Sequence, residues 1–225
     1  MTRIGVVTFP WSIDDQTVVR AVRLSGGTPV LLEHTVADLE GVEAVILPAG
    51  GSPSEHDDSG ALTASSPIMA EVVRAAEEGL PVLGIGSGFR VLCDAGVLPG
   101  RLGRNDSGAF LCRDQRMRVE TRDTVWTCAL DEGQDIVLVL KSGAGRYEAD
   151  ADTLQRLEDG HQVVLRYLGE NPNGSANAIA GITNERGNVV GLMAHPEHGI
   201  EALTGPSEDG RLVFRSVLTF VAAAS

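Results

Sequence analysis

Residues 81–90 read Pro-Val-Leu-Gly-Ile-Gly-Ser-Gly-Phe-Arg, and this stretch decides the fold. Its first half is a short apolar run, as is typical of a strand that is covered on both faces. A glycine-rich turn follows, and a helical pattern then continues to about Ala95. Because chemistry in open parallel sheets lies at the carboxyl ends of the strands, this turn is the first candidate for a functional site.

The chain before this turn alternates in the same way. Apolar runs at residues 4–9, 28–32 and 44–47 predict buried strands, whereas residues 14–24 and 67–78 have the apolar spacing of helices. The alternation predicts an α/β fold with a mostly parallel central sheet and helices on both of its faces.

The middle of the chain changes character, because charged residues are interleaved with apolar ones. Residues 116–126 and 135–140 are therefore predicted to form antiparallel strands, an extension of the parallel sheet. The remaining predicted elements are a short helix at 152–157, strands at 161–167, 178–183 and 189–193, and a last helix at 208–223. No repeat, low-complexity segment or linker divides the chain, so residues 1–225 are predicted to form a single domain.

Composition excludes several classes of protein. The 225 residues carry 18 Lys and Arg against 31 Asp and Glu, a formal charge of −13, which argues against nucleic acid or an anionic membrane as the main partner. A local phosphate site remains compatible with this charge, since backbone N–H groups can hold an anion in an acidic protein. No apolar stretch approaches the roughly 18 residues of a membrane span, and no signal peptide is evident. Three scattered cysteines make neither a disulfide framework nor a Cys-x-x-Cys metal site, so a cytoplasmic protein is expected.

The glycine-rich turn is close to three known motifs. A dinucleotide-binding G-x-G-x-x-G would need a glycine in place of Phe89. A serine nucleophile elbow, G-x-S-x-G, would need glycines on either side of Ser87 at positions 85 and 89. An elbow centred on position 86 has its flanking Gly84 and Gly88, but Gly86 itself stands where the nucleophile belongs.

Two further groups of titratable residues attract attention. His195 and Glu197 directly follow a predicted strand, and a histidine in this setting can act as a base that an acid orients. Taken without other evidence, such a pair is more often an exposed loop histidine beside an acidic residue than a catalytic pair. Glu55, His56 and Asp57 have the chemistry of metal ligands, but consecutive residues cannot easily converge on one ion. We therefore predict neither a metal site nor a cofactor.

Several longer strings match one family. The most specific are Asn171-Pro-Asn-Gly-Ser175 and Gly191-Leu-Met-Ala-His-Pro-Glu197, and residues 81–90 and Gly145-Arg-Tyr147 add to them. On these strings the chain resembles, over nearly its whole length, the glutaminase subunits of phosphoribosylformylglycinamidine synthase, class I (triad) glutamine amidotransferases of purine biosynthesis. The resemblance implies a flavodoxin-like fold and an ATP-dependent synthase subunit as partner.

The resemblance also implies a mechanism. In this family a cysteine on the elbow attacks the carboxamide of glutamine, and the ammonia released passes to the synthase subunit. By their place in the motifs, His195 and Glu197 match the base and its orienting acid, and Gly50 and Gly51 lie in the loop that holds the oxyanion. Gly86 stands at the position of the cysteine.

The departures from the family cluster around this site. Where the family reads Gly-Ile-Cys-Asn-Gly-Phe-Gln, this chain has Gly86, Ser87 and Arg90 in place of the cysteine, the asparagine and the glutamine. The loop of residues 48–58 is rewritten, and Ala194 replaces a proline. A single lost cysteine would suggest a laboratory variant, whereas this set favours a natural paralogue released from selection as a glutaminase.

No other residue is an obvious substitute for the missing thiol. Cys93 is predicted to pack inside the helix after the elbow, Cys112 belongs to a string found in relatives that keep the elbow cysteine, and Cys128 lies in the antiparallel middle. The hydroxyl of Ser87 is far harder to ionise than a thiol, and it lies one residue from the elbow tip.

Three functional hypotheses follow. The favoured one is a glutaminase-like subunit that cannot hydrolyse glutamine and still docks on a synthase-type partner. The second is an enzyme of a different reaction, which acts on a small amine, amide or carboxylate in the pocket of His195 and Glu197, with Arg90 as an anion-binding group. The third is a genuine glutaminase subunit that carries an inactivating mutation.

Overall fold

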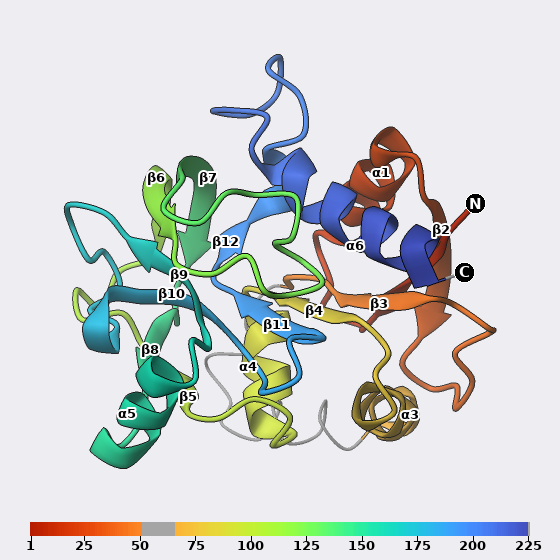
Figure 1. Ribbon diagram of the computed structural model, residues 1–225, viewed down its shortest axis with the longest axis horizontal. Helices are drawn as coiled ribbons and strands as arrows, with labels where there is room; N and C mark the ends of the chain where they lie inside the picture. Colours follow the sequence, from red (N-terminus) through yellow and green to blue (C-terminus); the bar gives the residue numbers. More distant parts are fainter. Residues whose placement is uncertain (51–65, 225) are drawn as a thin grey trace.

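The computed structural model describes residues 1–50 and 66–224 of the chain (Figure 1). Within these ranges, ten strands form one sheet with the order β12-β7-β6-β9-β10-β11-β4-β3-β1-β2. The strands of this sheet are β1 (Arg3–Thr8), β2 (Thr28–Glu33), β3 (Ala44–Leu47), β4 (Val82–Ile85), β6 (Leu111–Val119), β7 (Asp135–Ser142), β9 (Val163–Tyr167), β10 (Ile179–Thr183), β11 (Val189–Leu192) and β12 (Ala194–His195).

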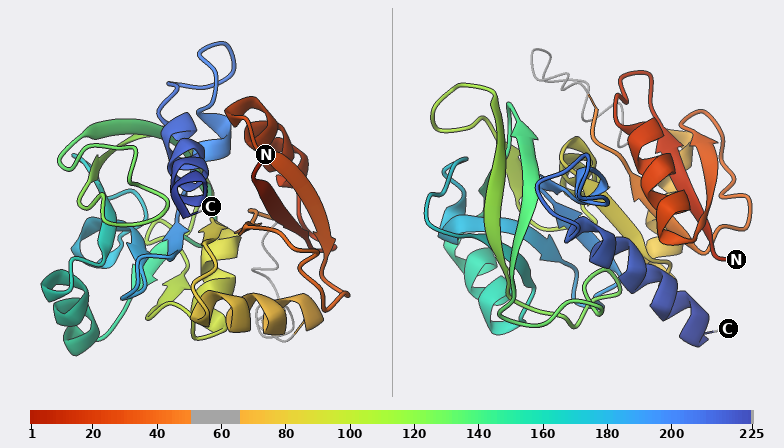
Figure 2. Two further views of the ribbon diagram at one scale, coloured as in Figure 1. Left: turned by 45° about the vertical axis from the view of Figure 1, so that its right-hand side comes forward. Right: turned by 90° about the horizontal axis from the view of Figure 1, so that it is seen from above.

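The half of the sheet from β11 to β2 is parallel, as the alternation of elements predicted. Every residue of β3, β4 and β11 is buried, because helices cover this half on both faces. Helices α1 (Asp15–Ser25) and α6 (Gly210–Ala224) lie on one face, and α3 (Pro67–Glu77) and α4 (Ser87–Asp94) lie on the other (Figures 1 and 2).

The other half, from β12 to β10, is antiparallel and continues the same sheet, so the predicted antiparallel extension is confirmed. Helix α5 (Ala151–Asp159) precedes β9 along the chain. Two short strands that the sequence analysis did not predict, β5 (Arg101–Gly103) and β8 (Arg146–Glu148), form a separate antiparallel pair. Two short 3-10 helices, η1 (Ala176–Ala178) and η2 (Pro196–His198), complete the set of described elements.

The predicted bounds of the strand at residues 116–126 are wrong, although residues 116–119 do lie in an antiparallel strand. Strand β6 begins earlier and ends at Val119, and the chain then turns between residues 124 and 130. The hydroxyl of Thr124 accepts a hydrogen bond from the Trp126 N–H at 3.1 Å and shares one with the Thr127 hydroxyl at 2.7 Å. Threonine side chains that bond to nearby groups in this way compete with strand pairing. Trp126 lies in this turn and its side chain is buried, so its apolar character did not distinguish a turn from a strand.

Bounds of the other predicted elements agree with the structure to within two residues at each end. None of the described helices combines the length and the apolar character that crossing a membrane requires.

Candidate functional site

The turn between β4 and α4 has the geometry of a nucleophile elbow. Gly86 has φ of +55° and ψ of −110°, a conformation that residues with a Cβ rarely adopt. Its neighbours are glycines for a different reason, which is close approach of the backbone. A Cβ on Gly88 would lie 2.1 Å from the carbonyl oxygen of Leu47, and one on Gly84 would lie 2.6 Å from the carbonyl oxygen of Gly88. The elbow glycines therefore let α4 begin directly against β3 and β4.

A side chain at position 86 would point at the imidazole of His195. The Cβ would lie 3.3 Å from His195 Nε2 and 3.2 Å from the Cβ of Ala49. The elbow thus still aims its tip at the candidate base, as expected where a nucleophile is to be deprotonated.

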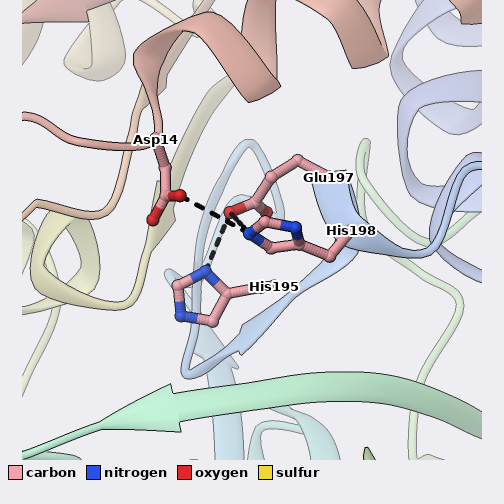
Figure 3. Close-up of side chains that lie close together, drawn as sticks. All are labelled: Asp14, His195, Glu197 and His198. Atoms are coloured by element: carbon pink, nitrogen blue, oxygen red, sulfur yellow. Dashed lines mark hydrogen bonds and ion pairs between the residues drawn. The ribbon is translucent and has the colours of Figure 1, made fainter. Parts of the chain in front are cut away.

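The candidate base and acid lie side by side in the interior (Figure 3). His195 is placed by the pairing of β12 with β7, and Glu197 follows in η2. His195 Nδ1 lies 2.8 Å from Glu197 Oε1, and the two residues are 1% and 2% exposed. The other ring nitrogen, Nε2, lies 3.1 Å from the carbonyl oxygen of Lys141. Both ring nitrogens of His195 therefore lie within hydrogen-bond distance of an oxygen atom.

Three residues that the sequence analysis missed surround this pair. Asp14, at the start of α1, lies 2.6 Å from the Nζ of Lys141 and 3.5 Å from the Nε2 of His198. Burial raises the pKa of Asp14, but the nearby imidazole of His198, the hydrogen bond from Lys141 and the charge of Lys141 outweigh it, and the pKa is lowered to about 2. The sequence placed Asp14 after β1, Lys141 at the end of β7 and His198 beside Glu197, and these positions were the only signal for the three residues. The order of the strands in the sheet is what brings them together.

This cluster has donor atoms of the kind that bind zinc. Ligand atoms of Asp14, His195, Glu197 and His198 all lie within 4.8 Å of one another, and two imidazoles with two carboxylates suit that ion. The ammonium of Lys141 already pairs with Asp14, however, and His195 Nδ1 already pairs with Glu197. Three of these four residues therefore already pair with each other or with Lys141, and we assign no metal to the cluster.

A cavity of about 100 Å³ lies in front of the elbow, and we call it the elbow cavity. Gly86 and His195 line it together with Gly50, Ser87 and Arg90. The structure thus brings together these five predicted site residues, with Glu197 behind His195. Gly51 and the run at residues 54–58 lie outside the described residues.

Two of the substituted residues have specific contacts in this cavity. The Ser87 hydroxyl accepts a hydrogen bond from the Gly50 N–H at 2.7 Å. The Arg90 side chain is about one quarter exposed, and its Nε lies 3.4 Å from the Asp94 carboxylate one turn further along α4. The Ser87 hydroxyl therefore accepts a hydrogen bond from a backbone N–H group beside the elbow. Arg90 adds a positive charge to the wall of the elbow cavity.

None of the three cysteines lines the elbow cavity. Cys93 is buried in α4 with its Sγ 3.8 Å from the carbonyl oxygen of Pro99, and burial raises the pKa of its thiol. Cys128 has its Sγ 3.4 Å from the carbonyl oxygen of Ser216, and Cys112 is exposed on β6. No cysteine thiol therefore stands in for the missing one.

Comparison with known proteins identifies the family of this fold and site. Residues 6–216 match the model of a CobB/CobQ-like glutamine amidotransferase domain. A protein of Nocardia farcinica named phosphoribosylformylglycinamidine synthase subunit PurQ is 54% identical over 222 residues, which are 99% of each chain. The subunit of the same name from Rhodococcus jostii is 52% identical over 99% of each chain. The chain belongs to the PurQ family.

Solved structures agree with this assignment to the PurQ family. A chain of the structure titled PurLQS from Thermotoga maritima superposes with a TM-score of 0.89 at 38% identity, over 98% of this chain and 99% of that one. A putative GMP synthase subunit from Thermoplasma acidophilum, at 14% identity and a TM-score of 0.69, shares the fold. The predicted class I glutamine amidotransferase fold and the family resemblance are both confirmed.

Proposed function

We propose that this member of the PurQ family is a docking subunit for an ATP-dependent synthase-type partner and does not hydrolyse glutamine. The observation that carries the proposal is Gly86 at the elbow tip, opposite His195. A triad glutaminase needs a nucleophile at that point, because the acyl intermediate forms on it. When one member of such a unit is lost, nearly all covalent catalysis is lost with it.

The surroundings of His195 support the same proposal. The Nε2 of His195 lies 3.1 Å from the carbonyl oxygen of Lys141, and no cysteine lines the elbow cavity beside it. A carbonyl oxygen has no proton to give, so the histidine has nothing here to deprotonate. The pair of His195 and Glu197 remains in place as a buried hydrogen-bonded unit without its third member.

The oxyanion side of the pocket is altered as well. The family resemblance assigns Gly50 to the loop whose N–H groups stabilise the oxyanion. Here the Gly50 N–H already donates to the Ser87 hydroxyl at 2.7 Å. Removal of one such donor from a working enzyme typically costs 10²–10³ in rate. We infer that the pocket has lost oxyanion stabilisation in addition to the nucleophile.

Docking on a synthase-type subunit is supported by the relatives and by the surface. The relatives are named as synthase subunits, and the similar chain of known structure is part of a PurLQS assembly. Ile13 and Phe110 line the elbow cavity, yet they are 66% and 68% exposed. Large apolar residues at the rim of a pocket are typical of a surface that a partner covers. A partner bound there would use free ammonia, or an amine delivered through the pocket.

A second candidate function is a different reaction in the same pocket. It is favoured by Arg90, whose guanidinium adds a planar cationic donor group to the cavity that His195 lines. An acid–base pair beside a cation suits a small substrate that carries an anionic group.

Co-purification with a synthase subunit from the same genome tests the docking proposal. We expect a stable complex whose ATP-dependent amidation proceeds with ammonium ion and not with glutamine. The double variant Ile13→Asp with Phe110→Asp should weaken the complex. It should leave the fold unchanged, since both side chains are exposed. Absence of a complex, or product formation from glutamine, would contradict the proposal.

A further inference from the structure

The chain has a single lysine, and that residue lines the elbow cavity. Of the 18 Lys and Arg residues, Lys141 is the only lysine. It lies near the end of β7 and lines the cavity together with Gly86 and His195. An arginine would supply the same charge, but only a lysine can give up its proton and act as a nucleophile. The position of this one amine is therefore compatible with covalent chemistry as well as with an ion pair.

A buried carboxylate holds the lysine side chain in place. The Nζ of Lys141 lies 2.6 Å from Oδ1 of Asp14, which is buried and also lines the elbow cavity (Figure 3 shows Asp14 beside His198). The Lys141 side chain is 21% exposed, so the ion pair lies between the interior and the cavity. The second oxygen of Asp14, Oδ2, is buried and has no hydrogen-bond partner among the described residues. Asp14 can therefore accept a further hydrogen bond.

The elbow cavity has room for a small molecule beside this amine. At about 100 Å³ it can hold more than one water-sized group, so a compound of a few heavy atoms fits. Gly86 contributes to this space, because it has no side chain at a point that lies 3.3 Å from His195 Nε2. The amine, the open space and a histidine that can carry a proton are thus on the walls of one cavity.

We propose that the Lys141 amine forms an imine with a small aldehyde or ketone in the elbow cavity. The lysine nitrogen bonds to the carbonyl carbon, the carbonyl oxygen leaves as water, and the product is a protonated imine. An ammonium and a carbonyl compound give a protonated imine and water, so atoms and charge balance and no oxidant or reductant is needed. The inference rests on the second candidate function and deepens it, because it names the class of its substrate.

Asp14 suits this step because the charge at the lysine nitrogen is the same before and after it. The ammonium and the protonated imine each carry one positive charge, so the buried carboxylate can pair with both. A reaction that removed the charge, such as acylation of Lys141, would leave Asp14 as an unpaired buried anion, which is costly. The ion pair of Asp14 and Lys141 therefore favours a carbonyl compound over an acyl donor.

His195 can supply the proton that the second half of the step requires. The ammonium gives a proton to water before its nitrogen attacks, and the hydroxyl of the resulting carbinolamine must gain one before it leaves as water. His195 lines the same cavity, and Glu197 holds the other side of its ring, with Nδ1 2.8 Å from Oε1. The group that His195 serves is thus brought into the cavity by the substrate.

Reductive trapping with glyoxylate and sodium cyanoborohydride tests the proposal. The reagent converts an imine into a stable secondary amine, and mass spectrometry of peptides shows which nitrogen carries it. The sequence offers two amines, Lys141 and the α-amine of the chain. At pH 7 a far larger fraction of an ordinary α-amine than of an ordinary lysine is unprotonated, so unassisted labelling favours the α-amine. We expect the reverse order, with about tenfold more adduct on Lys141 than on the α-amine.

The contribution of His195 is measured by the initial rate of labelling. His195→Gln should slow the labelling of Lys141 about 10²-fold, the lower end of what general acid–base catalysis contributes, and leave the α-amine unaffected. His161→Asn is the matched control, because His161 is exposed and does not line the cavity. Its φ of +52° is one that asparagine tolerates, and this variant should label as the wild type does.

The main comparison is made within the wild-type chain, so it does not depend on the folding of a variant. Adduct mainly on the α-amine, or equal adduct on the two amines, would overturn the proposal. Selective labelling of Lys141 that His195→Gln leaves unchanged would instead contradict the acid–base role of His195 in the second candidate function. The experiment uses neither glutamine nor a partner subunit, so its result is independent of the docking proposal.

Discussion

His195 Nε2 lies 3.3 Å from the point that a Cβ on Gly86 would occupy. The candidate base and the elbow tip therefore still face each other, although the tip carries no side chain. The elbow conformation, the buried contact of His195 with Glu197 and the flanking glycines are all retained. In our proposal, the site lacks the group that would react, and the polar contacts immediately around it do not suit glutamine hydrolysis.

Glycine at the elbow tip should stabilise the protein. At φ of +55° and ψ of −110°, a residue with a Cβ is strained, and such strain costs about 1–3 kcal/mol. Gly86→Ala should lower the free energy of unfolding by that amount, measured by urea denaturation. Gly143→Ala is a control in the same cavity, since among the described residues its Cβ would meet only Phe110, at 3.7 Å, and it should change stability by less than about 1 kcal/mol. Equal effects of the two substitutions would contradict the strain argument.

Restoring the thiol alone should not restore a working glutaminase. In Gly86→Cys the new side chain meets His195 at close range, and the Gly50 N–H still donates to Ser87. Adding Ser87→Ala frees that N–H, so the double variant should release ammonia from glutamine about 10²-fold to 10³-fold faster than Gly86→Cys. A coupled assay for ammonia release measures the difference between the two variants.

The single variant Ser87→Ala, which has no thiol at the elbow, is the control for this prediction and should show no activity. Full glutaminase activity in Gly86→Cys alone would contradict the view that the oxyanion side has also been lost.

Because Asp14 is ion-paired with Lys141, the stability of the protein should depend on pH in the acid range. The pKa of Asp14 is about 2 in the folded protein against an ordinary value of 3.8, so ionised Asp14 stabilises the fold by about 2 kcal/mol. A lowered carboxyl pKa means that this contribution is fully present above about pH 4 and is lost as the pH falls toward 2. Asp14→Asn should therefore be less stable than wild type by about 2 kcal/mol at pH 7, with a gap that narrows below pH 4.

Chemical denaturation at a series of pH values measures that gap. Glu132→Gln, at an exposed position, is the control and should show no difference in stability from wild type at any of these pH values. A difference between Asp14→Asn and wild type that stays constant down to pH 2 would show that the effect is packing rather than charge.

Much of the fold was predictable from the sequence, because each parallel strand is a continuous apolar run that ends in a turn signal. Residues 44–47 are one such run, and the structure has β3 with the same bounds. The elbow was predictable because Gly84 and Gly88 keep its spacing. The predicted end of the strand at 116–126 was wrong because Thr124 bonds to nearby groups in a turn. The buried Trp126 in that turn has the same apolar character as a strand residue.

The rest of the site depends on contacts between distant parts of the chain. Asp14 and Lys141 are 127 residues apart, and they meet because α1 follows β1 while the end of β7 lies next to β12. The hydrogen bond from Gly50 to Ser87 likewise depends on how the end of β3 lies against α4. Single positions carry no periodic pattern, so sequence analysis found neither contact.

Ammonia release from glutamine by the wild-type protein, in complex with its synthase subunit, tests the central claim most directly. We predict no glutamine-dependent ammonia above the background of the synthase subunit alone. Ammonia release that requires glutamine and disappears in His195→Ala would contradict the claim, because it would mean that the pocket of His195 cleaves an amide without a cysteine at position 86.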